Sequence, residues 1–165
     1  MSGGKDAPRG EALHIEPLRD HEDATIVGRW IYQEWARFEG KAVWRENRAD
    51  LQHSLDAAVA IPRFFVGLVD GERVGCASIV PHDLPTRPDL GPWLANILVL
   101  PDWRRRGFGR QLARAAMDHA CRHVPALYLY TFDQVDLYRH LGWTVLEQSE
   151  YSGRSITLMQ YRCTG

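Results

Sequence analysis

One segment near the middle of the chain constrains the fold more than any other. Residues 93–100 form a nearly unbroken apolar run, which is typical of a central strand that is covered on both faces. An arginine- and glycine-rich turn follows, and from Gly107 the apolar residues recur at helical spacing. The segment therefore predicts a strand that passes through a short turn into a helix, within a sheet that carries helices on its faces.

The remaining patterns extend this prediction to the whole chain. Further strands are expected at 13–17, 64–69, 74–80, 126–131, 143–151 and 154–162. Further helices are expected from the capping residue Asp20 to about Phe38, over about 47–60 with Pro62 as its end, and over 133–141. We expect one α/β (α+β) domain over residues 12–165, with about seven strands and four helices, after a disordered polar segment at 1–11.

Composition excludes several classes of protein. The 165 residues include 20 basic and 21 acidic residues, and this balance argues against a general nucleic-acid binder. No apolar run approaches the roughly 18 residues of a membrane span, and the first residues do not resemble a signal peptide. Cys76, Cys121 and Cys163 are an odd, sparse set, which predicts free thiols in a reducing compartment. The cytoplasm is therefore the expected location.

The turn between strand and helix has the properties of an anion site. The first N–H groups of a helix have no partner within it, and the helix dipole adds positive charge there. Gly107 and Gly109 let a ligand approach the backbone, and nearby arginines add charge. The Gly-Lys-Ser/Thr ending of a nucleotide-triphosphate loop and the third glycine of a dinucleotide fingerprint are both missing. Another polyphosphate is therefore predicted.

Two motifs give the chain a resemblance to the GNAT superfamily of acyl-CoA N-acyltransferases. Arg104, Gly107 and Gly109 match the family's central motif of Arg or Gln, two residues, Gly, one residue, and Gly or Ala. The run 137–143, Leu-Tyr-Arg-His-Leu-Gly-Trp, is similar to the Leu-Tyr and Leu-Gly-Phe/Trp pattern of a later helix in the family. The expected element order agrees as well, so the resemblance spans about residues 13–162.

The resemblance implies a role for each matched position. Backbone groups of Leu98, Val99 and Leu100 would bind the pantetheine arm, and Tyr138 would protonate the departing thiolate. The pyrophosphate of coenzyme A would be held by Arg104, Arg105, Arg106, Gly107, Phe108, Gly109 and Arg110. The reaction would be direct attack of a primary amine on acetyl-CoA. The acceptor would be a small molecule or a peptide, with no metal, nucleic acid or membrane involved, and the protein a monomer or homodimer.

The general base and the acceptor remain open at this stage. Some family members carry a catalytic glutamate on the central strand, but its first residues here are Trp93, Leu94, Ala95 and Asn96. The remaining candidates for the base are a water chain and the side chains of His82, Asp83, Glu34 and Glu150. Two other functions remain possible: a non-catalytic CoA-binding sensor of the same fold, and an RNA-associated module that uses the arginine cluster. Trp44 and Trp93 fit a cage for a cationic amine or simple packing equally well.

Overall fold

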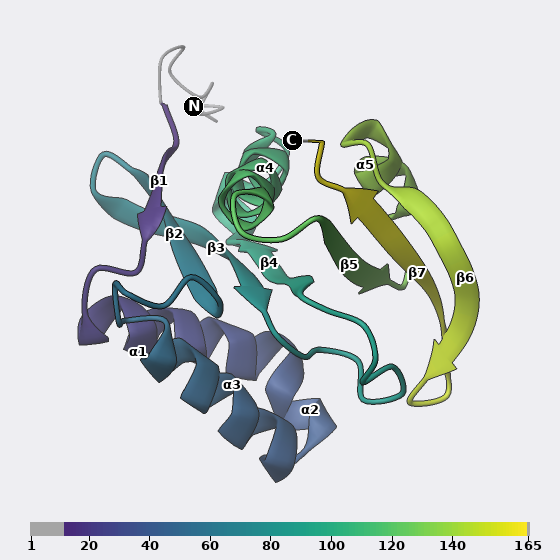
Figure 1. Cartoon of the computed structure of the whole chain (residues 1–165). Coiled ribbons are helices and arrows are strands. Elements are labelled where there is room, and N and C mark those ends of the chain that lie inside the picture. Colours follow the sequence, from purple (N-terminus) through teal and green to yellow (C-terminus); the bar gives the residue numbers. More distant parts are fainter. Residues whose placement is uncertain (1–11, 165) are drawn as a thin grey trace, which may run out of the picture.

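The strands in the middle of the chain are buried on both faces, and this burial sets the layers of the molecule. The computed structural model describes residues 12–164, so the disorder expected at 1–11 lies outside the described residues. Seven strands form one mixed sheet in the order β1-β2-β3-β4-β5-β7-β6 (Figure 1). The strands are β1 (His14–Pro17), β2 (Arg63–Val69), β3 (Glu72–Val80), β4 (Trp93–Val99), β5 (Ala126–Thr131), β6 (Thr144–Tyr151) and β7 (Arg154–Arg162).

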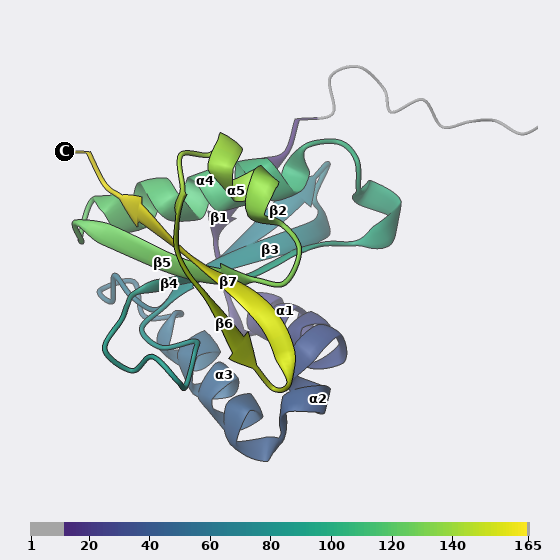
Figure 2. The same ribbon diagram turned by 90° about the vertical axis from the view of Figure 1, so that its right-hand side faces the viewer.

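Two helical layers cover the sheet, one on each face (Figures 1 and 2). The helical elements are α1 (His21–Ile31), η1 (Tyr32–Ala36), α2 (Arg37–Glu39), α3 (Lys41–His53), η2 (Pro101–Trp103), α4 (Phe108–Cys121) and α5 (Val135–His140). Neighbouring residues of β2 serve opposite layers: Phe64 joins the core under α1 and α3, while Phe65 joins the core under α4. The expected α/β (α+β) fold, a seven-stranded mixed sheet flanked by helices, is confirmed.

A close approach between α4 and the sheet fixes the position of that helix. A Cβ atom at Gly75 of β3 would lie 2.6 Å from the carbonyl oxygen of Leu98 and 2.9 Å from the side chain of Leu112. Only glycine fits there without movement of its neighbours. The missing side chain lets α4 lie directly against β3, so the start of α4 is held next to the end of β4.

The first helical segment follows the prediction at both ends but is not one regular helix. Asp20 caps α1, and its Oδ1 accepts a hydrogen bond from the Asp23 N–H at 2.9 Å. A π-helical turn, η1, then adds a residue to the helical repeat and rotates the faces that follow. Helical structure continues to Glu39, close to the expected end at Phe38. Phe38 is 72% exposed, whereas Trp35 is half-buried.

The second predicted helix is wrong in its position. It was expected over about 47–60, but α3 spans Lys41–His53, so Pro62 does not end it. The guanidinium of the buried Arg63 donates hydrogen bonds to the carbonyls of Ser54 (2.7 Å) and Asp56 (3.2 Å), and also to that of Val59. These bonds hold residues 54–60 in turns and satisfy carbonyl groups that a helix would otherwise use.

The expectation of free thiols is wrong for two of the three cysteines. Cys121, the last residue of α4, forms a disulfide with Cys163, while Cys76 is free and buried as expected. The chain end at Cys163 is also held by a hydrogen bond from its N–H to the carbonyl of Pro125 at 2.9 Å. The cysteine content therefore no longer argues for a reducing compartment. Within residues 12–164, the structure contains no helix long and apolar enough to cross a membrane.

Candidate active site

The strands β4 and β5 meet at one end only, and this leaves an opening inside the sheet. Their parallel pairing is at Trp93 and Tyr128, where the Tyr128 N–H donates to the carbonyl of Pro92 at 3.1 Å. Beyond that pair, β5 bonds to β7 and β4 bonds to β3. The edge of β4 that faces away from β3 is therefore available to a ligand.

A bulge bends β4 at the middle of this opening. Ala95 lies opposite Ser78 and Leu98 opposite Cys76, so β4 has one more residue than β3 between these pairs. The extra residue is accommodated at Asn96, whose φ of 57° is left-handed. The Asn96 side chain donates to the Ser78 hydroxyl at 2.9 Å, and that hydroxyl donates to the carbonyl of Ala95 at 2.9 Å. These bonds fix the bulge in place.

The three backbone positions expected to contact pantetheine differ in their availability. The N–H of Leu100 donates to the carbonyl of Val74 at 2.9 Å, so it is already used within the sheet. Leu98 is paired with Cys76 of β3, so its backbone N–H and carbonyl also point toward β3. Because backbone groups alternate along a strand, those of Val99 point toward the opening. The Val99 carbonyl accepts a bond from Nε of Arg104 at 2.9 Å, which leaves its N–H as the donor on that edge.

The arginine- and glycine-rich turn forms a cradle of backbone amides at the start of α4. Gly107 is the N-cap residue with a φ of 78°, and Arg105 is also left-handed with a φ of 64°. The N–H of Gln111 bonds to the carbonyl of Gly107 at 3.2 Å, so the N–H groups of Phe108, Gly109 and Arg110 precede the first helical bond. A Cβ at Gly107 would meet no atom within 4 Å, so this face of the turn is open.

The side chains of the turn have structural contacts of their own. Phe108 is 5% exposed and packs with Val69 and Val74, so only its backbone can face a ligand. The guanidinium of Arg106 lies 4.9 Å from the ring of Trp103, and that of Arg104 is tied to β4. These contacts hold the arginines beside the cradle, where their charge favours an anion.

Tyr138 lies on α5 at the other side of the opening. Its ring packs edge-on against the buried Trp143 with centroids 6.2 Å apart, and the Trp143 N–H donates to the Tyr138 carbonyl at 3.0 Å. Gly142, with a φ of 98°, turns the chain between them after the end of the helix. Burial raises the pKa of Tyr138 to about 12, so its hydroxyl stays protonated at neutral pH.

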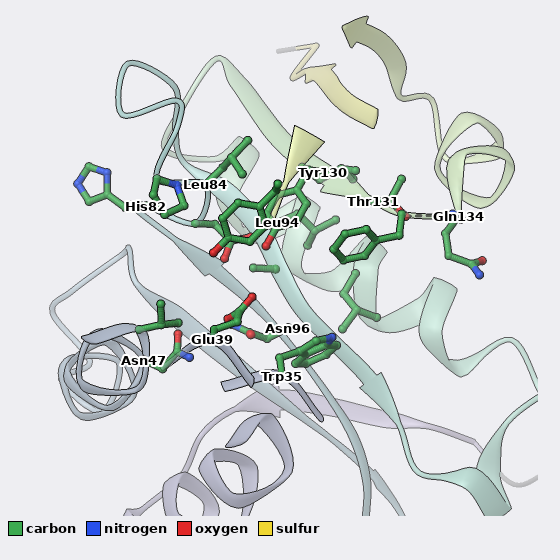
Figure 3. Close-up of a pocket in the computed structure, with 18 of the residues that line it drawn as sticks. Trp35, Glu39, Asn47, His82, Leu84, Leu94, Asn96, Tyr130, Thr131 and Gln134 are labelled. Atoms are coloured by element: carbon green, nitrogen blue, oxygen red, sulfur yellow. Dashed lines mark hydrogen bonds between the residues drawn. The ribbon is translucent and has the colours of Figure 1, made fainter. Parts of the chain in front are cut away.

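A cavity of about 400 Å³ connects Tyr138 with the bulge of β4 (Figure 3). Trp35 and Glu39 lie on one side of it and Tyr130 on the other. The cavity is lined by Trp35, Glu39, Val43, Glu46, Asn47, His82, Asp83, Leu84, Pro85, Pro88, Leu94, Ala95, Asn96, Ile97, Leu129, Tyr130, Thr131, Phe132, Asp133, Gln134, Tyr138 and Tyr151. A second hollow of about 480 Å³, between α1 and α3, is lined by Trp44 but by none of the residues predicted to bind coenzyme A or to transfer protons.

The structure separates the four side chains that were candidates for the base. His82 and Asp83 line the cavity, whereas Glu34 and Glu150 are exposed and lie outside its lining. The ring of His82 is at the outer margin in Figure 3. The segment that carries Asp83 is tied to β6 by Arg87, whose guanidinium pairs with Glu147 at 2.6 Å.

Asp83 has unusual electrostatic surroundings. Among residues 12–164, no hydrogen bond or ion pair to its carboxylate is formed. Burial raises the pKa of Asp83 to about 7, with further contributions from the negative charges of Glu39, Glu46 and Asp50. A carboxylate with this pKa can both accept and release a proton near neutral pH.

The sequence analysis missed Glu39, Glu46, Tyr130 and Tyr151 as cavity residues. A usable signal was present for the first two, because Trp35, Glu39, Val43 and Glu46 recur at helical spacing and line one side of the cavity. Trp35 packs against the core while also lining the cavity. Trp93 is fully buried, and Trp44 packs against Tyr32 at an interplanar angle of 58° and does not line this cavity, so neither forms a cage there.

Comparison with known proteins is consistent with this geometry. Residues 60–145 match the Acetyltransferase (GNAT) domain family, and a search of curated proteins finds no match. An acetyltransferase of the GNAT family from Streptococcus pneumoniae has a TM-score of 0.69 and 16% identity over 93% of this chain and 100% of its own. A protein from Salmonella typhimurium solved with its cofactor acetyl-CoA has a TM-score of 0.70 and 18% identity over 93% and 95%.

An aminoglycoside 6'-N-acetyltransferase complexed with coenzyme A also shares the fold, with a TM-score of 0.67 and 13% identity over 92% of this chain and 98% of its own. At these identities the likeness extends to the fold alone. Each of the three matches nearly the full length of both chains, so the whole arrangement of sheet and helices is shared.

Proposed function

We propose that this chain, which belongs to the GNAT acetyltransferase family, transfers an acetyl group from acetyl-CoA to a primary amine. The observation that carries the proposal is the position of Tyr138 on the same cavity as the bulge of β4. The end of that strand lies against the amide cradle, where a Cβ at Gly109 would lie 3.8 Å from the Val99 side chain. A binding module needs the cradle but has no use for a protonated tyrosine at that place.

The residues available fit coenzyme A. The N–H groups of Phe108, Gly109 and Arg110 would hold the pyrophosphate, with charge from the neighbouring arginines. The N–H of Val99 would bind the pantetheine arm along the open edge of β4. Bound there, acetyl-CoA supplies an activated thioester. Within residues 12–164, no group of three His, Cys, Asp or Glu side chains is arranged to hold a metal ion.

Two side chains of the cavity would handle the protons. Asp83 takes one proton from the incoming ammonium group, which makes the nitrogen a nucleophile. The nitrogen forms a bond to the acetyl carbon, and the bond between that carbon and sulfur breaks. Tyr138 donates its proton to the departing sulfur and regains one from the nitrogen. The amine thus loses two protons, one to Asp83 and one to the thiol through Tyr138.

Release of free thiol from acetyl-CoA in the presence of an amine panel tests the proposal. Tyr138→Phe should lower kcat by about 10²–10⁴ while acetyl-CoA binding, measured by calorimetry, stays unchanged. Tyr128→Phe is the matched control, because Tyr128 is half-buried on β5 but does not line the cavity. Binding of acetyl-CoA without thiol release for any amine would identify a sensor and contradict the enzyme.

The cradle is tested separately with a pair of glycine variants. Gly107→Val should abolish acetyl-CoA binding, because the new side chain occupies the open face of the turn. Gly71→Val is the control: its φ of 81° matches the 78° of Gly107, and its Cβ would also meet no atom within 4 Å. Both variants carry the same backbone strain. If only Gly107→Val loses acetyl-CoA binding, the loss is due to the blocked cradle and not to strain.

A further inference from the structure

We propose that the acceptor is a multiply charged amine, an extended molecule with at least two ammonium groups that bind along Asp83, Glu39 and Glu46. The inference rests on the proposed function and names the substrate class for the same cavity. It is carried by the charge of the lining, by the aromatic side chains beside the carboxylates, and by the origin of the carboxylates in two parts of the chain.

The lining of the cavity is strongly acidic. Its charged side chains are the carboxylates of Glu39, Glu46, Asp83 and Asp133, and it includes no lysine or arginine. Among residues 12–164, no ion pair neutralises Glu39, Glu46 or Asp83. One ammonium group would balance only one of these charges. An acceptor with a carboxylate of its own would be repelled.

Aromatic rings line the cavity beside the carboxylates. The rings of Tyr130 and Tyr151 meet edge-on with centroids 5.8 Å apart, and Trp35 lies on the opposite side. The faces of such rings attract cations, most strongly where water is partly excluded. Phe132 already stacks on the guanidinium of Arg154 at 3.8 Å. The other rings offer faces to an ammonium group and its methylene chain.

The carboxylates of the cavity come from two parts of the chain. Asp83 lies in the loop that follows β3, whereas Glu39 and Glu46 lie on α2 and α3. Asp83 and Glu39 are near Tyr130, because their charges contribute to the raised pKa of that phenol. The charges of Glu39, Glu46 and Asp50 also act on Asp83, so the carboxylates repel one another. Two cations in the cavity would relieve more of this repulsion than one.

This arrangement assigns a direction to the acceptor. The reacting nitrogen lies at Asp83, on the side of the cavity that also holds Tyr130, and the second ammonium lies toward Glu46 on α3. Arg48 of the same helix lines the hollow between α1 and α3 instead, so its charge does not enter the cavity. A linear di- or polyamine has the required shape and charge.

Three amines with the same number of carbon atoms give the decisive test: 1,4-diaminobutane, butan-1-amine and 4-aminobutanoate. Their far ends carry an ammonium group, no charge and a carboxylate, respectively. With wild-type protein and acetyl-CoA, kcat/KM for thiol release should fall in that order, by about tenfold or more at each step. The preference for the diamine should shrink as salt is added, because added ions screen charges near the surface. This comparison of three amines uses only the wild-type protein, so it does not depend on whether a variant folds.

Variants then locate the second ammonium. Glu46→Gln should lower kcat/KM for the diamine by about tenfold more than it changes kcat/KM for butan-1-amine, so that the ratio between the two amines falls by about that factor. Glu34→Gln is the matched control, because Glu34 is an exposed glutamate of η1 that lies outside the lining of the cavity. Circular dichroism of each variant verifies the fold.

The outcomes separate the two proposals. Equal kcat/KM for butan-1-amine and the diamine, or a preference for 4-aminobutanoate, would overturn the inference and leave the acetyltransferase intact. No thiol release with any amine, although acetyl-CoA binds, would overturn the proposed function itself. A preference for the diamine that is unchanged in Glu46→Gln would contradict the assigned position of the second ammonium.

Discussion

Two buried or half-buried carboxylates of this protein, Asp23 and Asp83, are surrounded in opposite ways. Asp23 is 0% exposed and accepts bonds from Nε of Arg19 at 2.8 Å and Nε of Arg73 at 2.7 Å. These bonds, led by that from Arg19, hold its pKa well below the ordinary value. Asp83 has no such partner, and its pKa is raised to about 7. The first carboxylate is part of the structure, whereas the second is free to exchange a proton or bind a cation.

The largest effect that would test this contrast is on catalysis. Asp83→Asn should lower kcat by about 10²–10⁴, because an amide cannot accept a proton from the ammonium group. Wild-type kcat/KM should rise with pH through about 7, as Asp83 of the free protein loses its proton, and the variant should lack this rise. Thiol release across pH 5–9 measures both.

A control for this variant exists in the same loop. Asp89→Asn removes a carboxylate that pairs with Arg87 at 3.0 Å and does not line the cavity, so it should leave the profile unchanged. The groups that face Asp83 are Glu39, Glu46, Asp50, His82, Tyr130 and Tyr151. A pH profile of Asp83→Asn that still rises near 7 would assign the proton transfer to one of these groups other than the two tyrosines, whose pKa values are raised above the ordinary value.

The next effect in size is on folding. Asp23→Ala should lower the free energy of unfolding by about 2–3 kcal/mol, less than for a fully buried pair because Arg19 is 42% exposed. Since the folded-state pKa lies below the unfolded value, this stabilisation is present above about pH 4 and lost as pH falls. Urea unfolding at pH 7 and pH 3 measures it. A large loss of kcat in the folded variant would show that Asp23 has more than a structural role.

The smallest expected effect is an increase in the free energy of unfolding. The folded protein keeps a proton on Asp83 that the unfolded chain releases between about pH 4 and about pH 7, so the stability of the wild type falls across that range. Asp83→Asn removes this dependence and should raise the free energy of unfolding at pH 8 by about 1 kcal/mol. Equal stability of variant and wild type at about pH 4 and a difference at pH 8 would verify the sign.

The parts of the fold that follow from local patterns could be predicted from the sequence. The bounds of β5 and β7 agree with the expected 126–131 and 154–162, because alternation and turn residues act over a few positions. The end of α3 could not, because it depends on the side chain of Arg63, which follows the helix in the chain and binds the carbonyls of Ser54 and Asp56 just after its end. The disulfide joins cysteines 42 residues apart in sequence, and a count of three gave no hint of the pairing.

The candidate site likewise has parts that the sequence identifies and parts that only the folded chain brings together. The amide cradle and Tyr138 belong to contiguous motifs, so the sequence alone identifies them, although their roles stay predictions. Glu39 and Asp83 come from different elements, and only the folded chain brings both to one cavity. Their charges matter because partners are missing, and a missing partner cannot be read from residue spacing.

The separation of β4 from β5 has a consequence for how the protein avoids unwanted association. An unpaired strand edge at the border of a sheet is open to strands of other proteins and promotes aggregation. Here the unpaired edge of β4 lies inside the sheet, with strands of the same chain on both sides. A slender arm with amide groups can enter and bond to it as a strand would. The chain thereby keeps a strand-like binding edge without the usual hazard of self-assembly.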